Sequence, residues 1–298
     1  MKNTKLISIN GKIYSPQEAK ISVFDRGFLY GDAVYEVARS YGRVFFELEK
    51  HIQRLFKSAE SIGMDLQKTP EDYIQEIYQV YSLVPDENMY MRIQITRGEG
   101  DIGLSTKLST KPNVIIYIRH LEFPASDFYS KGQKVVTTDR LRNSKRALDP
   151  NIKSGNYLNN VLAYRKATDE GAFEAVMINT KGEITEGTTS NIFRVQGGVV
   201  YSPPDDADIL RGITRGIVKS LCSELGISYK EEAFSGAELE KSEEVFLTSS
   251  TKEVVPVRQV NASSIKAPGE ITQRLAMAYK EYVKKYCEER KHLGVVRV

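Results

Sequence analysis

The stretch from Met89 to Thr96 reads MYMRIQIT, with apolar and polar side chains in alternation. Successive side chains of a β-strand point to opposite faces, so the apolar residues share one face and the polar residues share the other. The stretch therefore predicts a strand that lays one face on a core and holds Tyr90 and Arg92 together on the opposite face. The alternative for these two side chains is the solvent-facing side of an antiparallel sheet.

Helices and further strands are expected on both sides of this strand. Asn10-Gly11 is a strong hairpin signal. Apolar residues at helical spacing predict one helix that ends at Gly63, and Thr69-Pro70 predicts the start of the next. The fold class is therefore mixed, α/β and α+β. A hairpin is expected over 5–14, strands at 21–24, 114–118, 173–178, 183–186, 191–195, 199–201 and 244–248, and helices at 52–62, 69–85, 156–170, 213–225 and 269–290.

The length of 298 residues predicts two domains, because single cores stop growing near ~250–300 residues. Residues 122–132 hold turn formers and show no hydrophobic period, so this segment is predicted to connect the domains. The prediction is a smaller N-terminal α/β lobe at 1–121 and a larger C-terminal lobe at 133–298.

Composition argues against several classes of protein. Lys and Arg number 42 and Asp and Glu 39, and the resulting charge of +3 is too weak to favour nucleic acid. No apolar run approaches the roughly 18–20 residues that cross a bilayer, and the N-terminus shows no secretory signal. Cys222 and Cys287 are too widely separated in sequence for a disulfide framework or a zinc site. We therefore expect a reduced, cytoplasmic protein with no metal and no membrane partner.

Two residues are candidates for covalent and acid–base chemistry. Lys153 follows a loop and precedes a predicted helix. A lysine in a dry environment is a nucleophile that forms a Schiff base with an aldehyde, and an exposed surface lysine is the alternative. Glu186 ends a predicted strand before Gly187 and a run of small polar residues, where a carboxylate is placed to pair with a protonated ring nitrogen. An exposed glutamate in a turn is the alternative.

Several segments are candidates for binding an anion. Residues 210–215 enter a predicted helix, whose first N–H groups suit a phosphate, and 248–251 offer hydroxyl and N–H groups after a strand. Arg54 carries the planar guanidinium that binds phosphate through two hydrogen bonds, and a solvated helix face is its alternative. The basic run 140–146 either binds a small anion or forms a solvated loop, and the sequence assigns it no firm role.

Together these segments resemble the class IV, fold-type IV aminotransferases, which depend on pyridoxal phosphate. The resemblance covers nearly the whole chain, and its motifs occur in family order. The matching motifs are Asp25–Asp32 with Val34–Glu36, His51–Leu55, Ile152–Leu158, Glu186–Asn191, Gly212–Arg215 and Thr248–Glu253.

The resemblance implies a two-lobed fold like that of D-amino acid aminotransferase, with pyridoxal 5'-phosphate between the lobes. It implies that Lys153, in the larger lobe, bonds covalently to the cofactor, and that Glu186 pairs with the ring nitrogen. Tyr157 is expected at the phenolic oxygen of the cofactor. It also implies a homodimer in which the small lobe of one subunit completes the site of the other. The residues expected at the phosphate are Arg54, Ile213, Thr214 and Thr251, with Ile213 and Thr214 acting through backbone N–H groups.

The implied reaction is a transamination in two half-reactions. An amino acid gives up its amino group and leaves as a 2-oxo acid, while the freed Lys153 amine moves the substrate proton. A second 2-oxo acid then takes the amino group, which gives ping-pong kinetics. The implied partners are therefore a small amino acid and a small 2-oxo acid.

Three activities share this framework: transamination of branched-chain L-amino acids, transamination of D-amino acids, and lyase action on aminodeoxychorismate. Tyr90-Met91-Arg92, the loop at 98–103 and Tyr30 resemble the branched-chain enzymes. Well-studied D-amino acid enzymes carry an Arg-x-His carboxylate clamp in that loop, where this chain has Ile102 and Leu104. One feature points the other way, because Tyr35-Glu36-Val37 resembles the D-amino acid group.

The resemblance on balance favours branched-chain L-amino acids with 2-oxoglutarate as acceptor. Arg92 is expected to bind the distal carboxylate of glutamate, and Arg97 is the alternative. The residues expected to shape an otherwise apolar substrate pocket are Tyr30, Tyr90 and Tyr157.

A catalytically silent scaffold on the same fold is the alternative from a different functional class, because fold does not dictate function. The joint presence of Lys153, Glu186 and Arg54 argues against such a scaffold. The visible spectrum of the purified protein separates the two, since a silent scaffold is colourless.

Overall fold

The computed structural model describes residues 5–109, 111–125 and 127–294. The chain separates into two compact units. Unit 1 takes in the described residues of Met1–Glu122, Ile152–Asn156 and Val283–Val298, and unit 2 takes in those of Phe123–Asn151 and Tyr157–Tyr282. No helix in the described part of the chain combines the length and the apolar character that a bilayer crossing requires.

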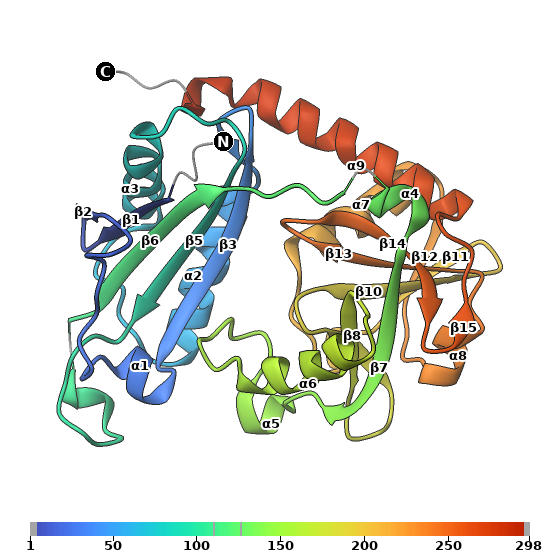
Figure 1. The fold of residues 1–298 in the computed structure, drawn as a ribbon, viewed down its shortest axis with the longest axis horizontal. Helices are drawn as coiled ribbons and strands as arrows, with labels where there is room; N and C mark the ends of the chain where they lie inside the picture. The colour runs from blue at the N-terminus through green and yellow to red at the C-terminus, as the bar shows by residue number, and fades with distance from the viewer. Residues whose placement is uncertain (1–4, 110, 126, 295–298) are drawn as a thin grey trace. The chain divides into compact units, whose positions relative to one another are not determined.

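Unit 1 is built on a six-stranded antiparallel sheet in the order β2-β1-β6-β5-β3-β4 (Figure 1). Two helices, α2 and α3, pack on one face of this sheet (Figure 1). The elements are β1 (Lys5–Ile9), β2 (Lys12–Tyr14), α1 (Arg26–Tyr30), β3 (Ala33–Tyr41), β4 (Val44–Phe45), α2 (Leu48–Ser61), α3 (Pro70–Ser82), β5 (Met89–Thr96), the 3-10 helix η1 (Thr106–Leu108) and β6 (Asn113–His120).

The sequence predicts three of these features well. The alternating stretch forms β5 with the expected bounds, and its apolar residues are fully buried while Tyr90 and Arg92 are half-buried. The β1–β2 hairpin turns at Asn10-Gly11, both with positive φ, as a tight two-residue hairpin loop requires. Helix α3 begins with a capping box from Thr69 followed by proline.

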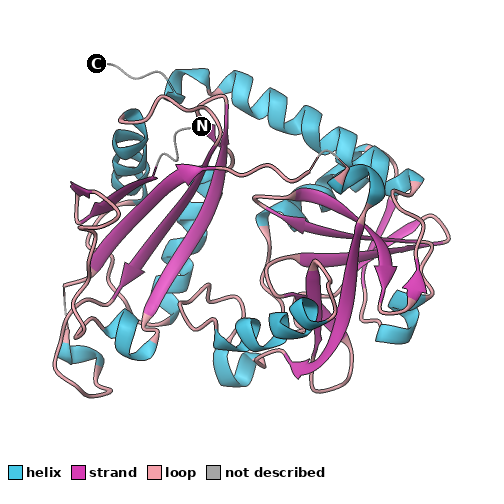
Figure 2. Ribbon diagram, in the orientation of Figure 1, coloured by secondary structure: helices cyan, strands magenta, loops and turns pink. Residues whose placement is uncertain are grey.

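Unit 2 is built on a nine-stranded mixed sheet in the order β12-β11-β10-β13-β14-β7-β8-β9, with β15 beside β14. Figure 2 distinguishes its strands, in magenta, from the helices, in cyan. The parallel pairs are β11 with β12, β14 with β7, and β7 with β8. The elements are α4 (Phe128–Lys131), β7 (Gln133–Leu141), α5 (Lys145–Leu148), α6 (Leu158–Asp169), β8 (Glu174–Ile178), β9 (Ile184–Gly187), β10 (Asn191–Gln196), β11 (Val199–Ser202), α7 (Ile213–Glu224), β12 (Ser228–Glu231), α8 (Gly236–Glu240), β13 (Glu244–Ser249), β14 (Glu253–Val260), β15 (Ser263–Ser264) and α9 (Glu270–Glu289).

One local feature differs from the sequence predictions. A strand at 21–24 is wrong, because Asp25 N–H donates to the Ser22 carbonyl at 3.1 Å and closes a turn there. The segment 122–132, predicted to connect the domains, contains helix α4, and the division between the units falls after Glu122.

The segment that carries Lys153 belongs to unit 1, not to the C-terminal part of the chain where the sequence placed it. The physical reason is backbone pairing along the edge of β3. Tyr35 N–H donates to the Lys153 carbonyl at 2.9 Å, and Gly155 N–H donates to the Ala33 carbonyl at 2.7 Å. Residues 153–155 therefore extend the unit 1 sheet beside β3. The last helix also crosses the division, since α9 begins in unit 2 and its residues from Val283 onward belong to unit 1.

Candidate functional site

Lys153 is held by its backbone at the β3 edge, and its amine lies over an aromatic ring of that strand. The Lys153 Nζ atom is 4.6 Å from the centroid of the Tyr35 ring. Its backbone N–H donates to Ser58 Oγ of α2 at 3.1 Å. The backbone bonds fix the Cα position, so the amine is presented from a rigid point on the sheet.

Arg92 lies against the same aromatic ring. The Arg92 guanidinium carbon is 3.7 Å from the Tyr35 ring centroid, a stacking distance. Its Nε and Nη2 both donate to Gln94 Oε1, at 3.1 and 2.8 Å. The polar face of β5 therefore carries a guanidinium that Gln94 and the Tyr35 ring hold in place. Tyr90, on that face, packs against Tyr117 and Arg119.

Arg54 is bound bidentately by a buried carboxylate that the sequence analysis gave no role. Arg54 Nε donates to Glu36 Oε1 at 2.6 Å and its Nη2 donates to Oε2 at 2.8 Å. His51 Nδ1 lies 2.7 Å from Glu36 Oε2. Glu36 is on β3 and the other two are on α2, one turn apart. The Arg54 side chain is only 14% exposed, so it does not lie on a solvated helix face.

Burial and the neighbouring Arg54 charge shift the pKa of Glu36 in opposite directions. Burial alone would raise the pKa of Glu36, but the charge and hydrogen bonds of Arg54, with the His51 hydrogen bond, hold that pKa well below its ordinary value. Burial lowers the pKa of His51 more than the hydrogen bond to Glu36 raises it. An ionised carboxylate only accepts hydrogen bonds, so neutral His51 donates from Nδ1. Glu36 thus fixes the orientation of both side chains.

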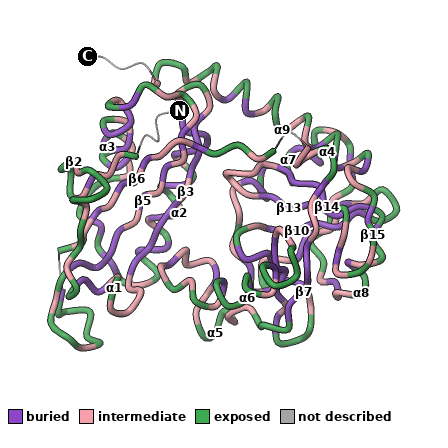
Figure 3. Tube along the Cα trace, viewed as in Figure 1, coloured by how far each residue is buried: buried purple, intermediate pink, exposed green. Residues whose placement is uncertain are grey.

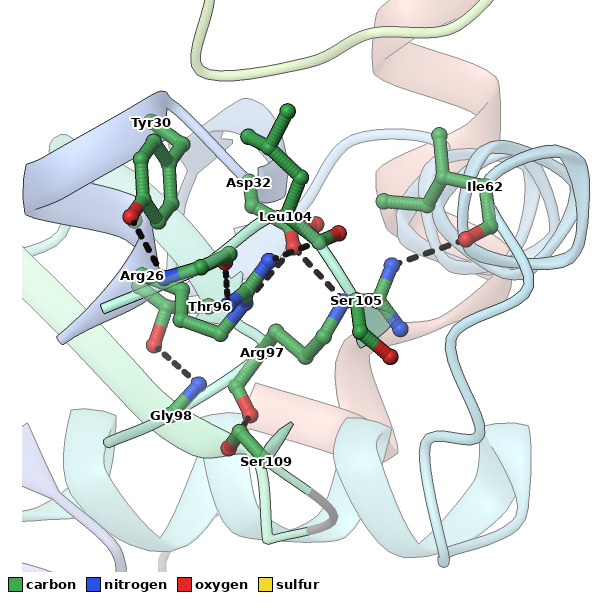
Figure 4. Close-up of polar contacts among 12 residues, drawn as sticks. Arg26, Tyr30, Asp32, Ile62, Thr96, Arg97, Gly98, Leu104, Ser105 and Ser109 are labelled. Carbon is green, nitrogen blue, oxygen red and sulfur yellow. Dashed lines mark hydrogen bonds and ion pairs between the residues drawn. The ribbon is translucent and has the colours of Figure 1, made fainter. Parts of the chain in front are cut away.

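Arg97, the alternative carboxylate ligand, supports the fold of unit 1 instead (Figure 4). Its Nε pairs with Asp32 Oδ2 at 2.7 Å, and its other nitrogens donate to the Ile62 and Gly63 carbonyls at 2.8 and 3.0 Å. Figure 4 shows the contacts of Arg97 with Asp32 and Ile62. This buried guanidinium therefore already has three partners within unit 1.

Tyr30 is among the side chains drawn in Figure 4, and it holds the loop that contains Gly103. Its hydroxyl accepts from Gly103 N–H at 3.0 Å, and Arg26 Nη1 donates to the Gly103 carbonyl at 2.7 Å. The loop so held presents Ile102 and Leu104, which are 75% and 84% exposed. Tyr30 therefore acts on the loop through its hydroxyl.

Glu186 lies at the end of β9 in unit 2 and is almost completely buried. Arg142 Nε donates to Glu186 Oε1 at 2.9 Å. The Leu210 N–H and Asn191 Nδ2 donate to Oε2 at 2.9 and 3.3 Å. Glu186 is thus a buried hydrogen-bond acceptor in unit 2, and the exposed turn residue offered as its alternative is excluded.

The start of α7 is tied to the same carboxylate. Asn191 Nδ2 also donates to the Leu210 carbonyl at 2.9 Å, so Glu186 and Asn191 together hold both backbone groups of Leu210. Gly212 is the N-cap of α7, and as glycine it has no side chain with which to cap the helix. The N–H groups of Ile213 and Thr214 belong to the first turn, the geometry that suits an anion.

Gly212 is required at this position by close approach. A Cβ atom there would overlap Asn191 Oδ1, whereas a Cβ at Gly216, in the same helix, would meet nothing within 4 Å. We expect Gly212→Ala to lower the free energy of unfolding by about 1–3 kcal/mol, because the added atom overpacks a buried contact. Gly216→Ala is the matched control and should raise stability by about 0.5–1 kcal/mol. Urea denaturation of both variants measures the difference, and equal effects of the two would contradict this account.

The loop that follows Glu186 is organised around a second buried carboxylate. Glu174 Oε1 accepts from Thr188 N–H at 3.0 Å and from the Thr188 hydroxyl. Its Oε2 accepts from Thr189 N–H at 3.1 Å and from Ser190 Oγ at 3.1 Å. Glu174 thereby fixes the loop between Glu186 and Asn191.

The remaining predicted residues lie at element ends in unit 2. Tyr157 precedes α6, and its carbonyl accepts from Val161 N–H at 2.9 Å. Thr251 lies in the turn between β13 and β14. Thr248, paired with Asn191 across β13 and β10, is buried, and its hydroxyl has no hydrogen-bond partner among the described residues. An orphaned hydroxyl beside the start of α7 is suited to a ligand.

Sequence reasoning missed four residues of these clusters: Glu36, Arg142, Glu174 and Asn191. The partners of Glu36, Arg142 and Glu174 are distant in sequence, and the five-residue spacing of Asn191 from Glu186 is typical of no element, so no local spacing reveals these contacts. The only signal is a charged residue inside a stretch that is otherwise apolar, as at Glu36, since a buried charge needs a partner.

The comparisons with known proteins agree with one another over nearly the whole chain. The family model for amino-transferase class IV matches residues 33–260. A putative branched-chain-amino-acid aminotransferase of Methanocaldococcus jannaschii is 38% identical over 278 residues, which is 92% of this chain and 95% of the relative. A D-alanine aminotransferase of Bacillus licheniformis is 35% identical over 274 residues, 91% of this chain and 95% of the relative. The crystal structure of a T.th. branched-chain amino acid aminotransferase with pyridoxamine 5'-phosphate superimposes with a TM-score of 0.90 at 27% identity, covering 97% of each chain.

Proposed function

We propose, from the premise that this chain belongs to the class IV aminotransferase family, that it moves the amino group of a branched-chain L-amino acid to 2-oxoglutarate. Aminotransferases act on amino acids and 2-oxo acids, and those of class IV use pyridoxal phosphate. The observation that carries the choice of substrate is the Arg92 guanidinium, fixed by Gln94 and Tyr35 near the Lys153 amine.

The residues present fit pyridoxal 5'-phosphate. The donor set contains an amine at Lys153, a buried carboxylate at Glu186, and a helix start whose N-cap is Gly212. The Thr248 hydroxyl, orphaned among the described residues, adds a donor close to that helix start. The aldehyde of the cofactor requires an amine, its ring nitrogen requires a carboxylate, and its phosphate requires a helix start. The three groups of this chain meet these three requirements.

The cofactor supplies an aldehyde that bonds to amines and a ring that accepts the electron pair left when the substrate loses its α-proton. In our proposal the Lys153 amine would hold the cofactor and, as a free amine, would carry the α-proton of the substrate. Glu186 accepts the N–H of the ring nitrogen and so favours the protonated ring. Arg54, Ile213, Thr214 and Thr251 bind the phosphate, and Tyr157 donates to the phenolic oxygen.

The two half-reactions use the same Lys153 amine, so donor and acceptor bind in turn and the kinetics are ping-pong. Arg92 binds the distal carboxylate of glutamate or 2-oxoglutarate, while Tyr30 and Tyr90 line the rest of the pocket. A bidentate arginine–carboxylate pair is strong and directional, which suits the recognition of an acidic substrate beside apolar ones.

We expect purified protein to transaminate L-leucine with 2-oxoglutarate and to leave D-alanine unchanged. Arg92→Leu should raise KM for 2-oxoglutarate by about 10- to 100-fold, because a charge-assisted pair contributes ~1.5–3 kcal/mol. The KM for L-leucine should change little, since leucine has no distal carboxylate. Coupled assays with each donor enantiomer measure both effects, and turnover of D-alanine alone would overturn the substrate assignment.

Transamination of D-amino acids is the second candidate, and specific observations favour it. The D-alanine aminotransferase of Bacillus licheniformis is 35% identical over most of both chains. The sequence Tyr35-Glu36-Val37 also resembles that group. Against it, the loop at 98–104 exposes Ile102 and Leu104 where such enzymes carry a cationic clamp.

We also propose a homodimer. Unit 1 exposes apolar side chains on two adjacent segments, which Gly100 N–H joins by donating to the Phe24 carbonyl at 3.3 Å. Such a concentration of exposed apolar groups is typical of an interaction surface. The exposed side chains are Val23, Phe24, Phe28, Ile102 and Leu104. A particle of twice the chain mass in light scattering is the expected result.

A further inference from the structure

Arg142 follows the last residue of β7 and lies two strands away from Glu186. Strands β7, β8 and β9 are neighbours in the unit 2 sheet, and Arg142 N–H donates to the Ile178 carbonyl at 2.8 Å. The registers of β7 with β8 and of β8 with β9 both shift near this end. Such irregularities bend a strand and re-aim its side chains. The Arg142 side chain thus reaches past β8 to the end of β9.

The contact between the two side chains is short and nearly dry. Arg142 Nε lies 2.9 Å from Glu186 Oε1, and the side chains are 10% and 6% exposed. The opposite oxygen, Oε2, receives Leu210 N–H and Asn191 Nδ2. Arg142 therefore brings a positive charge to the carboxylate, while Leu210 and Asn191 donate to it as neutral groups. It is also a member of the basic run 140–146, in which Arg140 and Arg146 are exposed.

A buried carboxylate without a cation tends to take up a proton, because burial disfavours the charged form. A protonated Glu186 would lack the negative charge that favours a proton on the ring nitrogen. A guanidinium beside the carboxylate stabilises its ionised form and lowers its affinity for a proton. A proton shared between Glu186 and a ring nitrogen would then reside on the nitrogen.

We propose that Arg142 is a positioning residue for Glu186, which it keeps ionised and fixed in orientation so that the ring nitrogen of the bound cofactor stays protonated. This inference rests on the proposed function, in which Glu186 pairs with that nitrogen. It assigns a role to one arginine of the basic run and leaves Arg140 and Arg146 as solvated surface residues. The proton is shared between Glu186 and the ring, and Arg142 neither gives nor takes one.

The test measures the protonation of the ring nitrogen directly. Wild type, Arg142→Met and Arg142→Lys are loaded with pyridoxal phosphate labelled with ¹⁵N in the ring, and the ¹⁵N resonance is recorded. Wild type should show a protonated nitrogen and Arg142→Met an unprotonated one, with kcat about 100-fold lower and substrate KM within about 3-fold. Arg142→Lys keeps the charge and should stay close to wild type. A wild-type resonance in Arg142→Met would overturn the proposal.

Two further variants separate this role from a merely structural one. Arg140→Met, in the same run but exposed, should match wild type in resonance and kcat. In a Glu186→Gln background, Arg142→Met should produce no further change in the resonance, because residues that act through one another are not additive. The double variant has two neutral side chains and no unpaired charge, so it can be measured even if Arg142→Met alone is too unstable to fold. A further shift of the ¹⁵N resonance in the double variant, relative to Glu186→Gln, would refute the proposal.

Failure of the proposed function gives a different result from failure of this inference. If wild type takes up no cofactor and shows no visible absorbance, the proposed function is wrong and the role of Arg142 is wrong with it. If wild type binds the cofactor with a protonated ring and Arg142→Met does the same, only the role of Arg142 is wrong.

Discussion

Replacing Lys153 with alanine should reduce transamination by about 10³-fold or more and remove the visible absorbance of the lysine-bound cofactor. In our proposal the Lys153 amine both holds the cofactor and carries the substrate proton, so its removal eliminates two functions at once. The variant should still fold. The contacts that place this segment at the β3 edge, Tyr35 N–H to the Lys153 carbonyl and Lys153 N–H to Ser58 Oγ, use backbone groups of residue 153.

The measurement is a steady-state assay with L-leucine and 2-oxoglutarate, together with a visible spectrum of each protein after dialysis. Lys57→Ala is the matched control, since Lys57 is an exposed lysine of the neighbouring helix α2. It should behave as wild type. Added methylamine should restore part of the activity of Lys153→Ala if the missing amine is the cause. Full activity or unchanged absorbance in Lys153→Ala would rule out our assignment of this residue.

The sequence predicts strand β5, of which only one face is buried, and it does not predict strand β3, of which both faces are buried. Strand β5 alternates because its second face is polar, so its period of two is visible. Strand β3 is buried along nearly its whole length, and it was not predicted (Figure 3). Its buried residues include Glu36, Arg39 and Ser40, which interrupt any apolar run. A doubly buried strand with polar residues carries neither of the two signals that predict strands.

The candidate site likewise contains residues that a local sequence motif predicts and residues that only distant contacts in the fold reveal. Lys153 and Glu186 are recognisable because each lies in a short motif whose neighbours are part of the signal. Glu36 and Arg142 act through residues 18 and 44 positions away, so only the paired strands and helices reveal them. The basic run 140–146 shows this most clearly. Its arginines look alike in the sequence, yet the Arg142 side chain pairs with Glu186 and is only 10% exposed, while Arg140 is exposed.

Replacing Glu36 with glutamine should lower the free energy of unfolding by about 3 kcal/mol near neutral pH. Glutamine keeps the size of the side chain but removes the charge that compensates Arg54. The Arg54 guanidinium would remain largely buried without its bidentate carboxylate, and a buried charge that loses its partner is costly. Glu60→Gln, an exposed residue of α2, is the matched control and should change stability by less than about 0.5 kcal/mol.

The difference between wild type and Glu36→Gln should become smaller in acid. Arg54 and His51 hold the pKa of Glu36 below its ordinary value, so folding favours the ionised form. The stability that this gives is complete above the ordinary carboxyl pKa of about 4.3 and decreases as the pH falls below it. The glutamine variant has no such contribution to lose. Urea denaturation from pH 7 to pH 3 should therefore show the two proteins converging, and a constant difference across that range would show that Glu36 does not act through its charge.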